Sequence, residues 1–280
     1  MRKNKEIRAE AVERVKPIKK KLMLYTLVWL LLVSAINAIP FVSIAGSFLS
    51  PFFALGFIVT VLNVFRGNGE NESPVSFFPH TFEYFKKTFF SYLWLILKCI
   101  VGLVLIIIAA VMLTTTNVVM LGSEIGSVKP SEMGSATLGI VSIVAAVLYF
   151  VGIIVLIVKV LDYQAISYEI IHSDPNKPAK EIVNDAKEHM KGHVGQWFCM
   201  SLYYGLKILI MYFVLAIVVS IIVAALQNAI VGTVSTILLV VFLFYLMINI
   251  YPQMICSCEL LFKEMVGDGE QNNPEQYTNS

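Results

Sequence analysis

The residues best suited to chemistry are an aspartate and two histidines in one polar segment. Asp185, His189 and His193 recur every four residues. This spacing places them on one face of a helix, where they could bind a divalent metal ion. However, Gly192 weakens a helix between the histidines, and no fourth ligand accompanies them. We therefore expect solvated or headgroup-facing histidines and no bound metal.

The cysteines indicate apolar packing. Cys256 and Cys258 are one residue apart, but two thiols without histidine or carboxylate partners are too few to hold a metal ion. All the cysteines lie in or beside apolar segments, which argues against a disulfide framework; they are Cys99, Cys199, Cys256 and Cys258.

The rest of the sequence lacks the common catalytic motifs. It has no glycine-rich phosphate loop, no Gly-x-Ser-x-Gly elbow and no His-Glu-x-x-His pair. Its apolar segments hold no paired carboxylates, which a membrane hydrolase or a proton relay usually needs. Nucleic-acid binding is disfavoured, because the basic N-terminus has no interleaved aromatic residues. We predict a non-enzymatic protein without a cofactor.

The elements that must position these residues are apolar helices. The chain is 58% hydrophobic and only 14% charged, whereas soluble domains carry about 25% charged residues. Apolar runs long enough to cross a membrane occupy residues 22–39, 43–65, 89–113, 136–161, 197–226 and 230–261. Helices satisfy their own backbone hydrogen bonds in lipid. The sequence therefore predicts an all-α, polytopic membrane helix bundle with six transmembrane helices.

The basic residues predict the orientation of these spans. Residues 1–21 form a basic helix candidate, and placing it in the cytoplasm puts 20 of the 21 Lys and Arg residues on the same side. Lys129 is the exception. We expect a multi-pass protein of the cell (plasma) membrane with both termini in the cytoplasm. The expected domains are residues 1–21, a membrane domain over 22–265 and a disordered polar tail over 266–280.

A charged cytoplasmic segment, residues 162–196, separates the fourth and fifth apolar runs, and residues 173–196 form its amphipathic part. Ile182, Val183, Ala186 and Met190 recur at spacings of three and four, opposite a charged face. This pattern predicts an interfacial amphipathic helix over residues 178–193, with its apolar face against the inner ends of the spans. It is either a plain connector or a gate or docking surface.

Two sets of residues are candidates for binding. A lipid or partner surface is predicted from basic residues near the N-terminus and from the amphipathic segment; its members are Arg2, Lys3, Lys19, Lys20, Lys21, Ile182, Val183, Met190 and His193. A second set consists of amides within or beside apolar runs, which either line a cavity or bond between helices; they are Asn37, Asn63, Asn249 and Gln253.

Short motifs along the chain resemble those of the bacterial integral membrane proteins of domain of unknown function 975. In the charged segment the motifs are Asp174-Pro175 and Met190-Lys191-Gly192-His193. Other matching residues are Arg8, Ala11, Gly56, Arg66, Gly67, Phe77, Phe78, Phe82, Tyr163, Tyr168, Pro252 and Phe262. The chain departs from the family at Phe150-Val151-Gly152, where the family has Ile-Pro-Gly. The resemblance implies a distant relation to the membrane domain of glycerophosphodiester phosphodiesterases and a lipid-adjacent setting.

Two functions are compatible with these observations. One is a transport or export component that handles a lipid or an amphipathic peptide. The alternative is a membrane scaffold that docks a cytoplasmic protein partner through residues 173–193. The sequence favours the first, because a lipid path has apolar walls and does not require the polar residues of an ion-coupled transporter. The expected partners are membrane lipids and this cytoplasmic protein.

Overall fold

The computed structural model describes residues 2–38, 40–124, 132–226 and 229–267, and this part of the chain is helical without strands. The helices are α1 (Asn4–Val15), α2 (Lys19–Ala38), α3 (Pro40–Phe65), α4 (Phe77–Glu124), α5 (Glu132–Asp162), α6 (Ile166–His172), α7 (Ala179–Met190), α8 (Val194–Leu226) and α9 (Ala229–Val266), with short 3-10 turns at Lys16–Ile18 and Gly69–Asn71. The all-helical prediction is confirmed.

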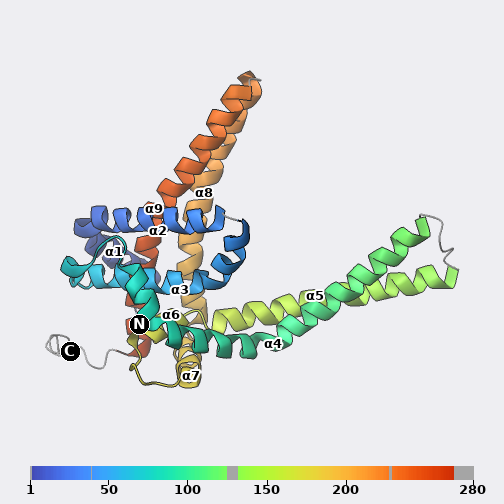
Figure 1. Cartoon of the computed structure of the whole chain (residues 1–280), viewed down its shortest axis with the longest axis horizontal. Helices are drawn as coiled ribbons and strands as arrows, with labels where there is room; N and C mark the ends of the chain where they lie inside the picture. Colours follow the sequence, from blue (N-terminus) through green and yellow to red (C-terminus); the bar gives the residue numbers. More distant parts are fainter. Residues whose placement is uncertain (1, 39, 125–131, 227–228, 268–280) are drawn as a thin grey trace.

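Two long helical hairpins dominate the shape of the molecule. α4 packs along α5, and α8 packs along α9. The hairpins leave a common base and diverge, so that their tips lie far apart (Figure 1). Their apolar side chains are largely exposed: Phe150 on α5 is 66% exposed and Ile221 on α8 is 64% exposed. Water-soluble proteins rarely expose apolar surface on this scale, so these hairpins are compatible with an apolar surrounding.

Four helices in the described residues are long and apolar enough to cross a membrane. They are Phe77–Val118, Thr137–His172, Val194–Ala225 and Ile230–Val266, with mean hydropathies of 2.5 to 3.1. They correspond to the last four expected spans. The first two expected spans coincide with α2 and α3. Within α3, the segment Leu49–Phe65 is an apolar helix shorter than these four. Four long apolar helices are compatible with a membrane protein.

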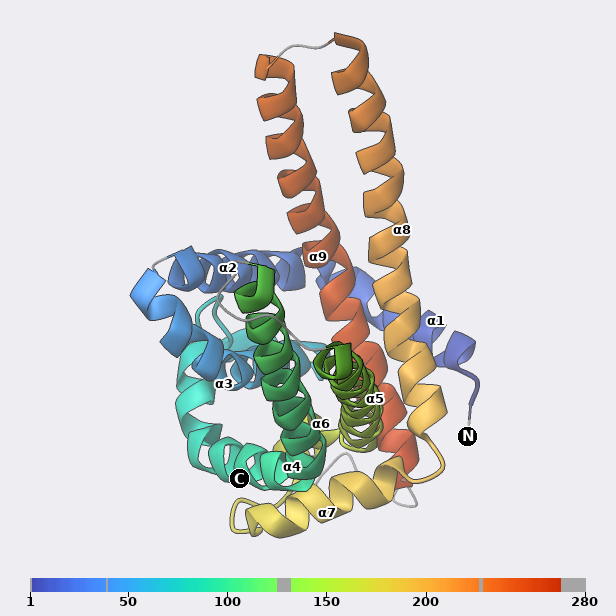
Figure 2. The same ribbon diagram turned by 90° about the vertical axis from the view of Figure 1, so that its right-hand side faces the viewer.

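Hydrogen bonds gather several helix ends into one polar base. Arg2 bonds to Glu264 at the end of α9, and Lys21 near the start of α2 bonds to the Gly69 carbonyl just after α3. Asn4 Nδ2 donates to the Gln196 carbonyl at the start of α8, at 2.8 Å. The start of α2, the end of α3, the start of α8 and the end of α9 therefore share one side of the molecule. Figure 2 shows α8 and α9 rising from this side.

Close helix packing in the base depends on a glycine. Gly56 on α3 faces the first turn of α4, where a Cβ would overlap the Phe77 carbonyl oxygen and lie 2.9 Å from the Thr81 nitrogen. Phe77 is itself buried. A residue larger than glycine would thus push the two helices apart.

α7 runs across the base (Figure 2), contacting α4, α5, α6 and α9. It starts directly after Pro178 and is followed by Gly192 in a left-handed conformation, with φ +84°. The positive φ at Gly192 turns the chain toward α8 without the strain that a side chain would meet. The apolar stripe of α7 is buried, and it consists of Ile182, Val183, Ala186 and Met190.

Some predictions concern residues that lie outside the described part of the chain. Most of the expected tail, from residue 268 onward, lies there. So does Lys129, the one basic residue assigned to the outer side.

Candidate functional site

A buried carboxylate forms the centre of the base. Glu259 on α9 has a fully buried side chain, and its Oε1 accepts hydrogen bonds from Arg66 Nη2 at 2.5 Å and Arg66 Nε at 3.2 Å. His172 Nε2 lies 3.2 Å from the same oxygen, and Lys263 Nζ lies 3.6 Å away. A buried carboxylate is tolerated only with such partners. The Glu259 carboxylate therefore joins the ends of α3, α6 and α9.

A second carboxylate fixes α7 to α6. Glu169 on α6 is almost fully buried, and its Oε2 lies 2.9 Å from His189 Nδ1. Its Oε1 lies 3.5 Å from Lys177 Nζ, which also pairs with Asp185 on α7. Burial lowers the pKa of Lys177, but the bond to Asp185 and the charge of Glu169 outweigh it and raise the pKa above its usual value. Lys177 therefore stays a cation and bridges the loop to α7.

The Phe262 ring packs against both histidines that pair with the two buried carboxylates. The Phe262 ring centroid lies 5.1 Å from the His172 ring and 6.2 Å from the His189 ring. Tyr168 stacks on the same ring at 6.0 Å, and its hydroxyl donates to the Ile255 carbonyl at 3.1 Å. Histidine–carboxylate pairs can move protons, but here each pair also holds two helices together.

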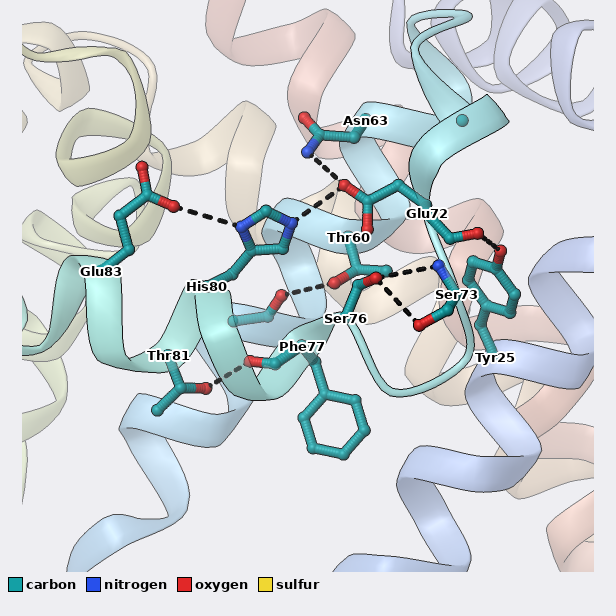
Figure 3. A network of polar contacts seen from close by, with 12 residues as sticks. Tyr25, Thr60, Asn63, Glu72, Ser73, Ser76, Phe77, His80, Thr81 and Glu83 are labelled. Atoms are coloured by element: carbon teal, nitrogen blue, oxygen red, sulfur yellow. Dashed lines mark hydrogen bonds and ion pairs between the residues drawn. The ribbon is translucent and has the colours of Figure 1, made fainter.

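A third polar group surrounds the loop between α3 and α4. Figure 3 shows the Glu72 carboxylate between Asn63 Nδ2 at 2.7 Å and His80 Nε2 at 2.9 Å. The Tyr25 hydroxyl donates to the Glu72 carbonyl, which ties α2 to this loop. Burial raises the pKa of Glu72, but the hydrogen bonds from Asn63 and His80 outweigh it and hold the pKa below its usual value of 4.5. The carboxylate is thus stabilised in its ionised form.

An open cleft of about 410 Å³ lies where α5 ends, α7 ends and α8 begins. Cavities of about 300–1,000 Å³ are typical of small-molecule sites. Charged and polar side chains line it together with two apolar ones; the lining residues are Asp162, Asn184, Lys187, Glu188, Met190, Lys191 and Val194. It offers open space beside charged groups in the base.

The residues predicted to form a lipid or partner surface lie in different environments. Ile182, Val183 and Met190 are buried by the protein itself, so these side chains are core residues and do not form an open surface. Their burial follows from the stripe facing α4 and α6. The basic members remain accessible at least in part: Lys3, Lys19 and Lys20 are exposed, while Arg2 pairs with Glu10 and Glu264, Lys21 bonds to Gly69, and His193 is half-buried.

The predicted cavity amides do not come together. Asn63 binds Glu72, and Asn249 Nδ2 donates to the Tyr245 carbonyl one turn earlier in its own helix, at 2.8 Å. Gln253 is half-buried, and the side chain of Asn37 lies outside the described side chains. None of the described three lines the cleft. Asp185 and His189, the candidate metal ligands, face Lys177 and Glu169.

Sequence reasoning missed the carboxylates at the centre of the base. Glu259 lies inside the last apolar run, and an ionisable residue in such a run is a signal of a specific partner. Its partner Arg66 comes from a segment 193 residues away. Three of the residues that carried the family resemblance, Arg66, Tyr168 and Phe262, meet in this group.

A family model described as "Protein of unknown function (DUF975)" matches residues 1–204, which span α1 to the first part of α8. No curated protein and no solved structure matches the chain. The matched region covers the polar base except for its α9 component, and it includes all residues of the cleft.

Proposed function

Since the chain belongs to the DUF975 family, we propose that this member is a non-enzymatic, multi-pass membrane protein that moves a lipid. The observation that carries the proposal is the pair of apolar hairpins that diverge from one polar base, with an open charged cleft at the junction of α5 and α8. A lipid needs this combination of apolar walls and a polar end. Passage of a lipid between leaflets is the transport activity we propose.

The proposed topology has six spans with both termini in the cytoplasm. The contacts among Arg2, Lys21, Gly69 and Glu264 gather the start of α2, the end of α3 and the end of α9. Arg66 and Lys87 also bond within the base, to Glu259 and to the Ser173 carbonyl. This concentration of basic residues on one side supports a cytoplasmic base under the positive-inside rule.

Exposed apolar side chains on both hairpins supply apolar walls. α5 exposes Phe150, Ile154 and Ile157, and α8 exposes Leu202 and Leu209. α5 contacts α8 over a short stretch, and the hairpins separate beyond it (Figures 1 and 2). Acyl chains fit such walls without any loss of hydrogen bonds, because neither partner carries polar groups there. This favours a lipid over an ion or a polar solute.

The alternative is a scaffold that docks a cytoplasmic protein through residues 173–193. A helix that docks in this way usually presents its apolar side to the partner. In α7 that side is already buried against α4 and α6, which leaves a charged face. The structure therefore supports the scaffold less well than lipid movement.

The proposal is tested in vesicles that contain the purified protein and a fluorescent phospholipid in both leaflets. Chemical quenching of the outer leaflet reports lipid that crosses the membrane. We expect faster loss of the protected fluorescence than in protein-free vesicles. Lys187→Glu with Lys191→Glu should slow this loss of fluorescence, whereas the matched surface pair Lys5→Glu with Lys16→Glu should not. A folded protein that leaves lipid movement at the protein-free rate contradicts the proposal.

A further inference from the structure

The cleft at the junction of α5, α7 and α8 has four charged residues on its lining. Lys187 and Lys191 supply two positive charges, and Asp162 and Glu188 supply two negative charges. The structure gives none of these four side chains an ion-pair partner, whereas Lys177, Asp185 and His189 nearby are all paired. The cleft thus holds balanced charges that do not neutralise one another by direct contact.

The position of the cleft restricts what can occupy it. Asp162 is the last residue of α5, and Val194 is the first residue of α8. Beyond Lys159 in α5 and Gln196 in α8 both helices are apolar, and their exposed apolar side chains continue along the hairpins. An occupant with its charged end in the cleft would therefore extend its remaining part along apolar walls.

We propose that the cleft binds the headgroup of a phospholipid that carries both a phosphate and a primary amine. The inference rests on the lipid-handling function proposed above. The phosphate pairs with Lys187, in the last turn of α7, and with Lys191, the residue that follows the helix. The amine donates hydrogen bonds to Asp162 and Glu188, and the acyl chains lie between α5 and α8.

Other headgroups satisfy only part of this lining. A phosphate joined to an uncharged alcohol leaves Asp162 and Glu188 without a cation and adds repulsion between like charges. A quaternary ammonium keeps the positive charge but has no N–H group to donate to a carboxylate. A phosphate with a primary amine pairs with all four charged side chains, and each exposed ion pair contributes about two- to fivefold in affinity.

The test compares three phospholipids with identical acyl chains and ethanolamine, glycerol or choline headgroups. Native mass spectrometry of the detergent-solubilised protein, with equal amounts of the three lipids, measures which one is retained. We expect the ethanolamine lipid to exceed each competitor by about two- to fivefold. Asp162→Asn with Glu188→Gln should abolish its advantage over the glycerol lipid, and Lys187→Gln with Lys191→Gln should reduce retention of all three.

Matched variants separate this effect from a general change in charge. Glu13→Gln with Glu181→Gln removes two exposed acids elsewhere, and Lys5→Gln with Lys16→Gln removes two exposed lysines; both should keep the wild-type preference. Free phosphoethanolamine should not displace the lipid at comparable concentration. Its displacing the lipid would mean that the site takes a soluble molecule and would overturn the proposal.

The retention experiment tests the headgroup assignment, whereas the vesicle assay tests lipid movement. Equal retention of the three lipids by the wild type, or an ethanolamine preference that survives Asp162→Asn with Glu188→Gln, overturns the headgroup assignment even if lipid still crosses the membrane. Absence of lipid movement in vesicles contradicts the proposed function instead, whatever the headgroup preference.

Discussion

The Glu259 carboxylate and the Arg66 guanidinium are 193 residues apart in the chain and 2.5 Å apart in the structure. Glu259 is fully buried, so its charge depends on this contact and on His172. The pair joins the end of α9 to the end of α3. It thereby connects the α8/α9 hairpin to the part of the base that holds α4.

Removing Arg66 should therefore destabilise the whole protein. Breaking a buried ion pair by deleting one partner costs about 3–5 kcal/mol, because the other charge stays buried. We expect Arg66→Ala to fall at the lower end, since Arg66 is partly exposed. Lys263→Ala is the control: Lys263 lies 3.6 Å from the same carboxylate and is more exposed, so its loss should cost below about 1 kcal/mol. Thermal unfolding in detergent measures the stability of both variants. Equal losses of stability would contradict the assignment of Arg66 as the main partner of Glu259.

The ionised form of Glu72 should make stability depend on pH. Its pKa is lower in the folded protein than its usual 4.5, so its contribution is complete above pH 4.5 and is lost as the pH falls through the lowered pKa. Glu72→Gln should therefore lower the unfolding temperature at pH 7. The difference between wild type and variant should shrink when the pH falls below 4.5. Thermal unfolding over this range tests the prediction, and a difference that grows with acidity would refute it.

The apolar stripe of α7 should be essential for folding, unlike its charged face. Val183 is buried, so Val183→Asp loses about 1.5–3 kcal/mol of apolar burial and also places an unpaired charge in the base. Glu181→Lys, on an exposed position of the same helix, should change stability by within about 0.5 kcal/mol. Thermal unfolding and protease cleavage of residues 173–193 report both effects. Equal tolerance of the two changes would mean that α7 is not packed as described.

Gly56 should not accept a side chain. A Cβ at this position would overlap the Phe77 carbonyl oxygen, so Gly56→Ala must separate α3 from α4 and should cost about 1–3 kcal/mol. Gly205→Ala is the matched control in α8, where no atom lies within 4 Å of the added Cβ. The comparison is of unfolding temperatures of the two variants in the same detergent. Similar values would show that the helices do not approach as closely as we infer.

Helices could be predicted from the sequence where one local pattern decides them. The runs ending at Phe65 and Leu161, for example, are close to the observed ends of α3 and α5. α4 starts at Phe77, well before the expected residue 89, because its first turns are amphipathic and pack in the base. The sequence does not predict α6 as a separate helix, because its seven residues follow the apolar run of α5 after only a short turn at residues 163–165.

The candidate site could be predicted much less well than the helices. Periodicity singled out Ile182 and Val183 as one stripe, but it could not show which helices would cover them. The pairing of Glu259 with Arg66, and of Glu72 with Asn63 and His80, depends on how distant helices pack. The cleft likewise exists only because Asp162 and Lys191 are brought together by the path of the chain around α7.

The central claim is that a lipid lies between α5 and α8 with its headgroup in the cleft. An experimental density map of the protein in phospholipid nanodiscs tests this most directly. We predict an ordered lipid whose phosphate lies beside Lys187 and Lys191 and whose acyl chains follow the exposed faces of α5 and α8. A map in which α5 and α8 pack against each other along their lengths, or in which a second copy of the chain fills the space, would contradict the account.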